Sequence, residues 1–98
     1  MNVMESASVE RLFSIISQLQ TPEECRLFFE DICTIREVQD MAQRLEVAKL
    51  LRDGKNYQEI SAETAVSSAT ISRVNRCLVY GGGGYRTALE KYEAEEQK

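Results

Sequence analysis

The chain is 98 residues long, with 43% hydrophobic and 7% aromatic residues and a formal net charge of −4. Its length fits one domain, and its composition excludes a disordered chain. No apolar run approaches the roughly 20 residues that a membrane-spanning helix needs. Three cysteines without a CxxC pair, in a chain without histidine, exclude the common zinc sites, so neither a metal nor a resident cofactor is expected.

The first residues, Met1–Arg11, lack the basic and apolar segments of a signal peptide, which indicates a cytoplasmic protein. Cysteines in that compartment stay reduced. We therefore expect Cys25, Cys33 and Cys77 to be free thiols that lie buried as small apolar residues.

Charge is distributed unevenly along the chain. Residues 1–43 contain eight acidic and three basic residues, residues 44–91 five acidic and eight basic, and residues 92–98 three acidic and one basic. The central segment thus has a net charge of +3 between acidic ends, which suits a surface that faces phosphates. Scattered, solvated charges would give the same count, so charge alone leaves both interpretations open.

Apolar residues at helical spacing predict helices from the beginning of the chain. The first should span residues 8–19. Thr21, Pro22 and Glu24 then form the signature of a capping box and open a second helix. The apolar side of this second helix consists of Cys25, Phe28, Phe29 and Ile32.

A second capping box, Thr34 to Glu37, opens a longer helix that ends near Asp53, where Gly54 is a suitable C-cap. The apolar stripe of this helix is Val38, Met41, Ala42, Leu45, Ala48 and Leu51.

Three more helices are predicted after Gly54. Asn56, with Glu59, caps a short helix that ends near residue 64, and the next helix spans residues 67–80. Gly81–Gly84 end that helix, and a last helix over Tyr85–Glu93 leaves residues 94–98 frayed. Six helices joined by short turns predict an all-α fold.

The segment Gln58–Arg76 has the pattern of a helix-turn-helix, in which apolar anchors and small residues recur at fixed positions. The anchors are Ile60, Val66 and Ile71, the small contact is Ser61 or Ala62, the turn residue is Ala65, and Ser67 caps the second helix. The same spacing occurs in helical hairpins that bind no nucleic acid, so the spacing alone does not decide.

The exposed face of the second motif helix favours DNA binding. Small and basic residues are expected there, and Asp and Glu are absent from residues 65–87. The predicted reading residues are Ser67, Ser68, Ala69, Thr70, Ser72, Arg73 and Arg76. Lys55 and Gln58 precede or begin the first motif helix, where they would contact phosphates, although ordinary surface residues would look the same.

Three runs of residues resemble the Trp repressor family. They are Ala42-Gln43-Arg44-Leu45-Glu46-Val47, Leu50-Leu51-Arg52-Asp53-Gly54 and Ala69-Thr70-Ile71-Ser72-Arg73. Over residues 9–92 the chain also looks like the Trp repressor-like proteins of the YerC/YecD type, through Thr21-Pro22-Glu23-Glu24, Phe28-Phe29-Glu30-Asp31 and Ser72-Arg73-Val74-Asn75-Arg76.

The resemblance implies one domain, residues 1–98, that forms an intertwined homodimer with a six-helix Trp repressor-like fold. Residues 8–53 would hold the dimerisation helices, residues 56–80 the helix-turn-helix and residues 85–93 the C-terminal helix. Two recognition helices would then lie about 34 Å apart over a palindromic operator.

The resemblance also implies a pocket for tryptophan or another small effector. By position, Arg44, Thr70 and Arg73 match residues of the tryptophan site in Trp repressor. Val74 and Cys77 stand where that site has a glycine and a serine, and the valine occupies volume that a bound indole needs. Arg44 therefore also has a second interpretation, as a structural or phosphate-facing arginine.

Two functions remain open, and a third is not expected. The leading one is a sequence-specific transcription regulator on double-stranded DNA, a repressor by occlusion because no segment is left to recruit polymerase. The alternative is a protein-interaction module with a vestigial helix-turn-helix, which the acidic total charge supports. An enzyme is not expected, because histidine and a phosphate loop are missing and the adjacent acids Glu23-Glu24 and Glu30-Asp31 point to different sides of a helix. The glycine run is either a hinge or a helix stop.

Overall fold

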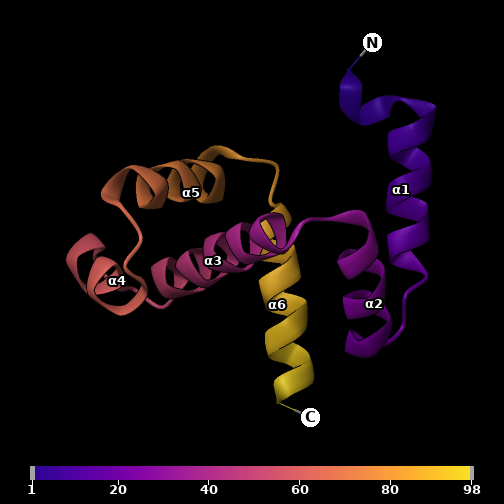
Figure 1. Ribbon diagram of the computed structural model, residues 1–98. Helices are drawn as coiled ribbons and strands as arrows, with labels where there is room; N and C mark the ends of the chain where they lie inside the picture. Colours follow the sequence, from indigo (N-terminus) through magenta and orange to yellow (C-terminus); the bar gives the residue numbers. More distant parts are fainter. Residues whose placement is uncertain (1, 98) are drawn as a thin grey trace. The chain divides into compact units, whose positions relative to one another are not determined.

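Six α-helices and one short 3-10 helix make up the computed structural model, which describes residues 2–97 (Figure 1). The elements are η1 (Val3–Glu5), α1 (Ala7–Ser17), α2 (Pro22–Ile32), α3 (Ile35–Arg52), α4 (Tyr57–Thr64), α5 (Ser68–Tyr80) and α6 (Gly84–Glu96). No strand occurs between residues 2 and 97, and the all-α prediction is confirmed. The parts of the predictions that concern residues 1 and 98 lie outside the described residues.

Reciprocal caps begin two of the predicted helices. The Glu37 amide donates a hydrogen bond to the Thr34 hydroxyl at 3.1 Å, and the Thr34 amide donates to the Glu37 carboxylate at 2.8 Å. Two hydrogen bonds hold the pKa of Glu37 below its ordinary value: the one from the Thr34 backbone has the larger effect, and the one with the Thr34 side chain the smaller. Asn56 and Glu59 form the same pair at the start of α4. Both capping boxes are therefore confirmed.

The predicted box at the start of α2 is only half formed. The Thr21 hydroxyl accepts a hydrogen bond from the Glu24 amide at 3.1 Å. The Glu24 carboxylate, however, accepts from the Gln20 amide at 3.5 Å rather than from Thr21. The carboxylate therefore reaches one residue further back than the capping box requires.

The chain divides into two compact units, Met1–Val38 and Gln39–Lys98, with the boundary inside α3. In the described part of the first unit, no side chain is fully buried. Phe28 and Phe29 are half-buried and meet edge to face, with ring centroids 5.5 Å apart, while Leu27 is 57% and Ile35 80% exposed. Since helices in proteins take most of their stability from a buried apolar face, this unit has no sufficient core of its own.

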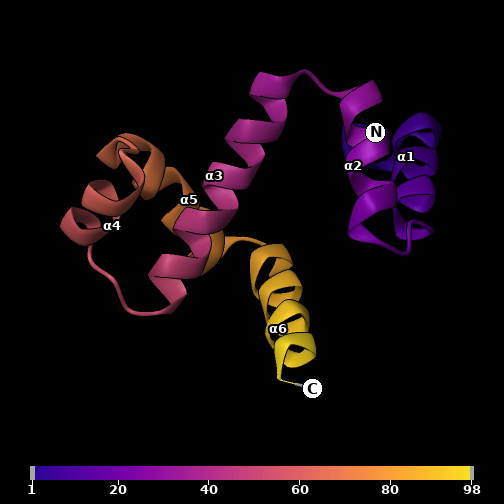
Figure 2. The same cartoon turned by 60° about the horizontal axis from the view of Figure 1, so that its bottom comes forward.

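The second unit has an apolar core to which α3, α4, α5 and α6 all contribute. Figure 2 shows how these four helices are arranged. Its buried members are Val47, Ala48, Leu50, Ile60, Val66, Ile71, Val74 and Leu89. Leu51 and Tyr85 pack against it from the side. This core holds α5, the predicted reading helix, against the end of α3.

The apolar stripe predicted for α3 is only partly right. Ala48 and Leu51 do lie in or on the core, but Met41 and Leu45 stay 38% and 44% exposed. Val47 and Leu50, which the stripe omits, are buried instead. The C-terminal half of α3 packs with three other helices and therefore buries more than one of its sides. A prediction based on one apolar stripe does not include the residues on the other buried side.

Two smaller predictions are corrected. Helix α6 continues to Glu96, whereas fraying was expected from residue 94. Contacts within and beyond α6 explain the extra turn: Arg52 forms an ion pair with Glu93 at 3.1 Å, and a hydrogen bond with Glu96 raises the pKa of Tyr92. The three cysteines are free, but Cys25 and Cys33 are half-buried and Cys77 is exposed.

The glycine run after α5 has two positions that tolerate no side chain and two that do. A Cβ on Gly81 would overlap the backbone oxygen of Cys77, and Gly83 has a φ of +90°. Gly82 and Gly84 meet nothing within 4 Å of an added Cβ. The run therefore forms a defined turn into α6, as a helix stop would.

Candidate nucleic-acid interface and effector pocket

The predicted helix-turn-helix is present as α4, the turn at residues 65–67 and α5. Ile60 and Ile71 are fully buried and Val66 is 4% exposed, so all three predicted anchors lie in the core. Ser61 and Ala62 both remain exposed, so neither supplies a buried contact between the helices. The motif is therefore held together by its large anchors.

Ala65 has the left-handed conformation that the turn requires, with φ 59° and ψ 21°. A Cβ in this region costs roughly 1–2 kcal/mol, which glycine avoids at an entropic cost of about 0.5–1 kcal/mol. We expect Ala65→Gly to raise the free energy of unfolding by about 0.5–1 kcal/mol, measured by urea denaturation. Ala62→Gly, at an exposed position inside α4, should lower it by a similar amount. Destabilisation by both variants would show that the turn is not strained.

The start of α5 is fixed by a small polar network. The Thr70 amide donates to the Ser67 hydroxyl at 3.3 Å, and the two hydroxyl oxygens lie 3.2 Å apart. Ser67 is thus the N-cap that the sequence predicted. Thr70 is half-buried, and its hydroxyl is already engaged in this cap.

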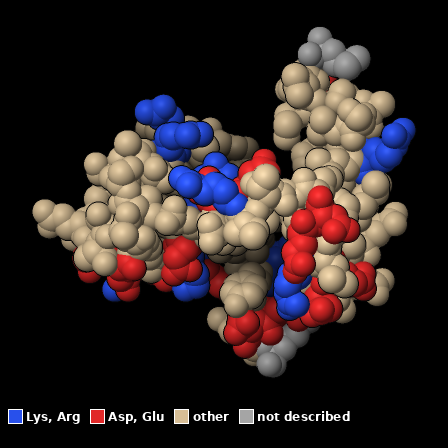
Figure 3. Space-filling view, in the orientation of Figure 1, with Lys and Arg blue, Asp and Glu red and all other residues tan. Residues whose placement is uncertain are grey.

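The remaining reading residues are exposed. Ala69, Ser72, Arg73 and Arg76 follow one another at intervals of three, one and three residues, which places them on the same side of α5. Between residues 2 and 97, neither arginine has a carboxylate within ion-pair distance. In this unit, Figure 3 shows Lys and Arg side chains without acidic neighbours over α5, whereas acidic and basic side chains lie together near α4 and α6.

Two further predicted contacts lie at the beginning of α4. Lys55 is just before the Asn56 cap and Gln58 is in the first turn, and both are exposed. Their positions suit contacts with a phosphate backbone near the helix start.

Three of the five residues assigned to an effector pocket line one hollow of about 440 Å³. These are Arg44, Arg73 and Cys77. The sequence-based assignment missed Met41, Leu45 and Tyr85, which complete the lining. Met41 and Leu45 belong to the predicted apolar stripe of α3. The sequence does not tell which other helix these two side chains face.

Thr70 and Val74 do not line this hollow. Thr70 belongs to the cap of α5, and Val74 is 2% exposed in the core. Val74 therefore does not occupy the space of a ligand in this hollow. It could affect a bound ligand only by changing how α5 packs on the core.

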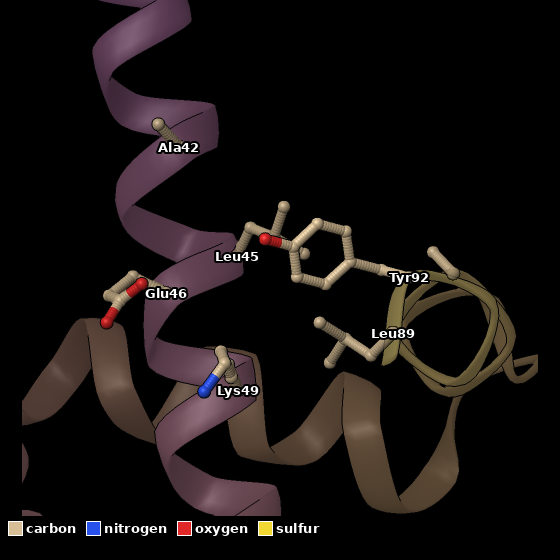
Figure 4. A pocket seen from close by; sticks show the side chains of 7 residues that line it. Ala42, Leu45, Glu46, Lys49, Leu89 and Tyr92 are labelled. Carbon is tan, nitrogen blue, oxygen red and sulfur yellow. The ribbon is translucent and has the colours of Figure 1, made fainter. Parts of the chain in front are cut away.

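A second hollow, of about 370 Å³, separates the middle of α3 from α6 and was not predicted (Figure 4). Its lining consists of Ala42, Leu45, Glu46, Lys49, Ala88, Leu89 and Tyr92. Tyr92 and Leu89 extend from α6 toward Leu45 on α3. Lys49 also lines this hollow. Its ammonium lies 3.3 Å from the carboxylate of Asp53, and the hydrogen bond between them raises the pKa of Lys49.

Among residues 2–97, no group of three or more His, Cys, Asp or Glu side chains could hold a metal ion. None of the helices described is both long enough and apolar enough to cross a membrane.

Known proteins resemble the chain over nearly its whole length. The family model for the Trp repressor protein matches residues 7–93. A Bacillus subtilis (strain 168) protein described as "Uncharacterized protein YerC" is 48% identical over 93 residues, or 95% of this chain and 89% of its own length.

Two crystal structures share the fold. A TrpR-like protein from Eubacterium eligens ATCC 27750 is 45% identical, with a TM-score of 0.90 over 95% of this chain and 96% of its own. A chain from Staphylococcus aureus is 40% identical, with a TM-score of 0.87 over the same shares. By the family model, the sequence identity and the structural match, the chain belongs to the Trp repressor family.

Proposed function

We propose that the protein is a homodimeric transcription regulator that binds double-stranded DNA sequence-specifically through α5 and represses by occlusion in the cytoplasm. The observation that carries the proposal is the exposed face of α5, where Arg73 and Arg76 lie among small side chains without a neutralising carboxylate. Its family is one of DNA-binding proteins rather than enzymes, which supports the same conclusion.

The chemistry of this face suits the major groove. Small residues in the first turn of α5, such as Ser68 and Ala69, allow the helix to approach base edges closely. Arginines further along the helix reach guanine edges or phosphates. Lys55 and Gln58 contribute phosphate contacts, which position the helix but carry no sequence information.

The proposed homodimer accounts for the apolar surfaces that one subunit leaves uncovered. The first unit has no fully buried side chain, and Met41 and Leu45 on α3 are more than one third exposed. Apolar surface of this extent marks a protein–protein contact. In the proposed division of the chain, residues 8–53 form the dimer, residues 56–80 bind DNA and residues 85–93 brace the subunit.

The proposal is tested by in vitro selection from a random duplex library with the purified full-length protein. We expect a palindromic sequence to be enriched and its affinity to fall steeply with salt, because each phosphate contact releases counterions. Enrichment of no sequence at moderate ionic strength would contradict the proposal. Retention of a protein partner in the same material would then support an interaction module.

A further inference from the structure

The exposed face of α5 continues past the last predicted reading residue. At the end of this helix, Val79 is 56% and Tyr80 84% exposed. Tyr80 follows Arg76 by four residues and Arg73 by seven, which places the three side chains on one stripe of the helix. Tyr80 therefore lies on the proposed DNA-binding side of α5, one turn beyond Arg76.

Tyr80 makes no polar contact within its own subunit. Among residues 2–97, its hydroxyl forms no hydrogen bond and its ring pairs with no other aromatic ring. The apolar core of this unit does not include it either. The only charged residues of α5 are Arg73 and Arg76, and Asp and Glu are absent from residues 65–87. These surroundings favour an anionic partner for the exposed phenol over an apolar one.

The length of the stripe decides what Tyr80 can reach on DNA. Ala69 and Tyr80 are eleven positions apart, which at about 1.5 Å per residue gives about 16 Å along the helix axis. The major groove is only about 12 Å wide. A recognition helix that meets base edges with its first turns thus places its last turn beside a sugar–phosphate backbone.

The last turn of α5 can donate a hydrogen bond to a phosphate only through a side chain. Backbone amides at a helix C-terminus are already engaged in the helix, and the carbonyl end carries partial negative charge. Of the residues in this turn, Cys77, Leu78, Val79 and Tyr80, only the tyrosine has a strong donor. Tyrosine hydroxyls are among the regular donors to DNA phosphates.

We propose that Tyr80 is a positioning residue that fixes the C-terminal end of α5 to the DNA backbone. Its hydroxyl donates a hydrogen bond to a phosphate oxygen, and its ring and Val79 cover the adjacent deoxyribose. The contact carries no sequence information, but it sets the depth and tilt at which Arg73 and Arg76 meet the bases. The inference rests on the proposed function, since it names a further contact of the same DNA-binding surface.

The test compares Tyr80→Phe and Tyr80→Ala with the wild-type protein by fluorescence anisotropy, on the selected operator and on a scrambled duplex. Removing the hydroxyl alone should weaken binding to both duplexes by about 2- to 12-fold, the range for one neutral hydrogen bond. Tyr80→Ala also removes the ring and should lose at least about threefold more. The slope of affinity against salt should stay unchanged, because a neutral phenol releases no counterion, whereas loss of a lysine or arginine contact lowers the slope by about one.

Tyr92→Phe is the matched control. It removes the same hydroxyl from an exposed tyrosine on α6 and should leave the affinity for both duplexes unchanged. A scan of single methylphosphonate substitutions along the operator then locates the contacted phosphate. At one phosphate of each half-site, the loss of affinity should be at least about twofold smaller for Tyr80→Phe than for the wild type. This coupling distinguishes a direct contact from a general effect on the fold.

Three results would overturn the inference: wild-type affinity of both Tyr80 variants on both duplexes, a loss confined to the operator, or weaker self-association of Tyr80→Ala in sedimentation equilibrium. The first shows no contact, the second a base contact, and the third a contact between subunits. The proposed function fails separately, if the wild-type protein selects no duplex. The affinity of the Tyr80 variants for the scrambled duplex then still decides whether the backbone contact exists.

Discussion

Alanine in place of Arg76 is expected to weaken binding to the selected operator by about 5- to 150-fold. This range corresponds to the roughly 1–3 kcal/mol that a bidentate contact from arginine to guanine contributes. Arg73→Ala should have an effect in the same range. Fluorescence anisotropy with the operator and with a scrambled duplex, at several salt concentrations, measures both the affinity and its salt slope.

The scrambled duplex distinguishes reading from positioning. A variant that loses affinity only for the operator has lost a base contact, whereas equal losses on both duplexes with a salt slope smaller by about one indicate a lost phosphate contact. Arg11→Ala, which removes a charge from α1, is the matched control and should leave operator affinity unchanged. Operator binding that survives both Arg73→Ala and Arg76→Ala would show that α5 presents a different face to DNA.

Glutamate in place of Phe13 is expected to turn the proposed dimer into a monomer. Phe13 lies on α1 and is 44% exposed in the single subunit, so a partner subunit is expected to bury it. Burying an unpaired carboxylate costs several kcal/mol, which corresponds to at least a hundredfold weaker self-association. Sedimentation equilibrium at a series of protein concentrations measures this change directly.

The neighbouring position supplies the control. Ser14→Glu adds the same charge to the same helix, at an exposed polar position, and should leave the association constant within about twofold. Circular dichroism should show loss of helix for Phe13→Glu only, since the second unit keeps its own core. A wild-type protein that sediments as a monomer, or a Phe13→Glu protein that remains dimeric, would contradict the proposed homodimer.

Local signals were enough to predict most of the fold. Caps at Thr34 and Asn56 and the glycines after Tyr80 mark helix ends through contacts within a few residues, and the structure reproduces these ends. The anchors of the helix-turn-helix were equally predictable, because Ile60 and Ile71 must point inward for two short helices to share a core.

Features that depend on how distant helices meet could not be predicted. Tyr85 lines the hollow beside Arg44, and Val47 is buried where the stripe of α3 omits it. Neither fact follows from local spacing, since each depends on the packing of α3 with α5 and α6. The residues predicted to read DNA lie between these cases: their exposure on α5 was foreseen, whereas the engagement of Thr70 in the cap was not.

If the protein forms the proposed homodimer, the missing core of the first unit makes subunit concentration part of its thermodynamics. A segment whose apolar faces are completed only by association gains stability by mass action, so its melting temperature rises as more chain is present. At low abundance, two half-sites on one operator would raise the local concentration of subunits and help to fold them. For such a chain, folding, assembly and occupancy of the operator are linked equilibria.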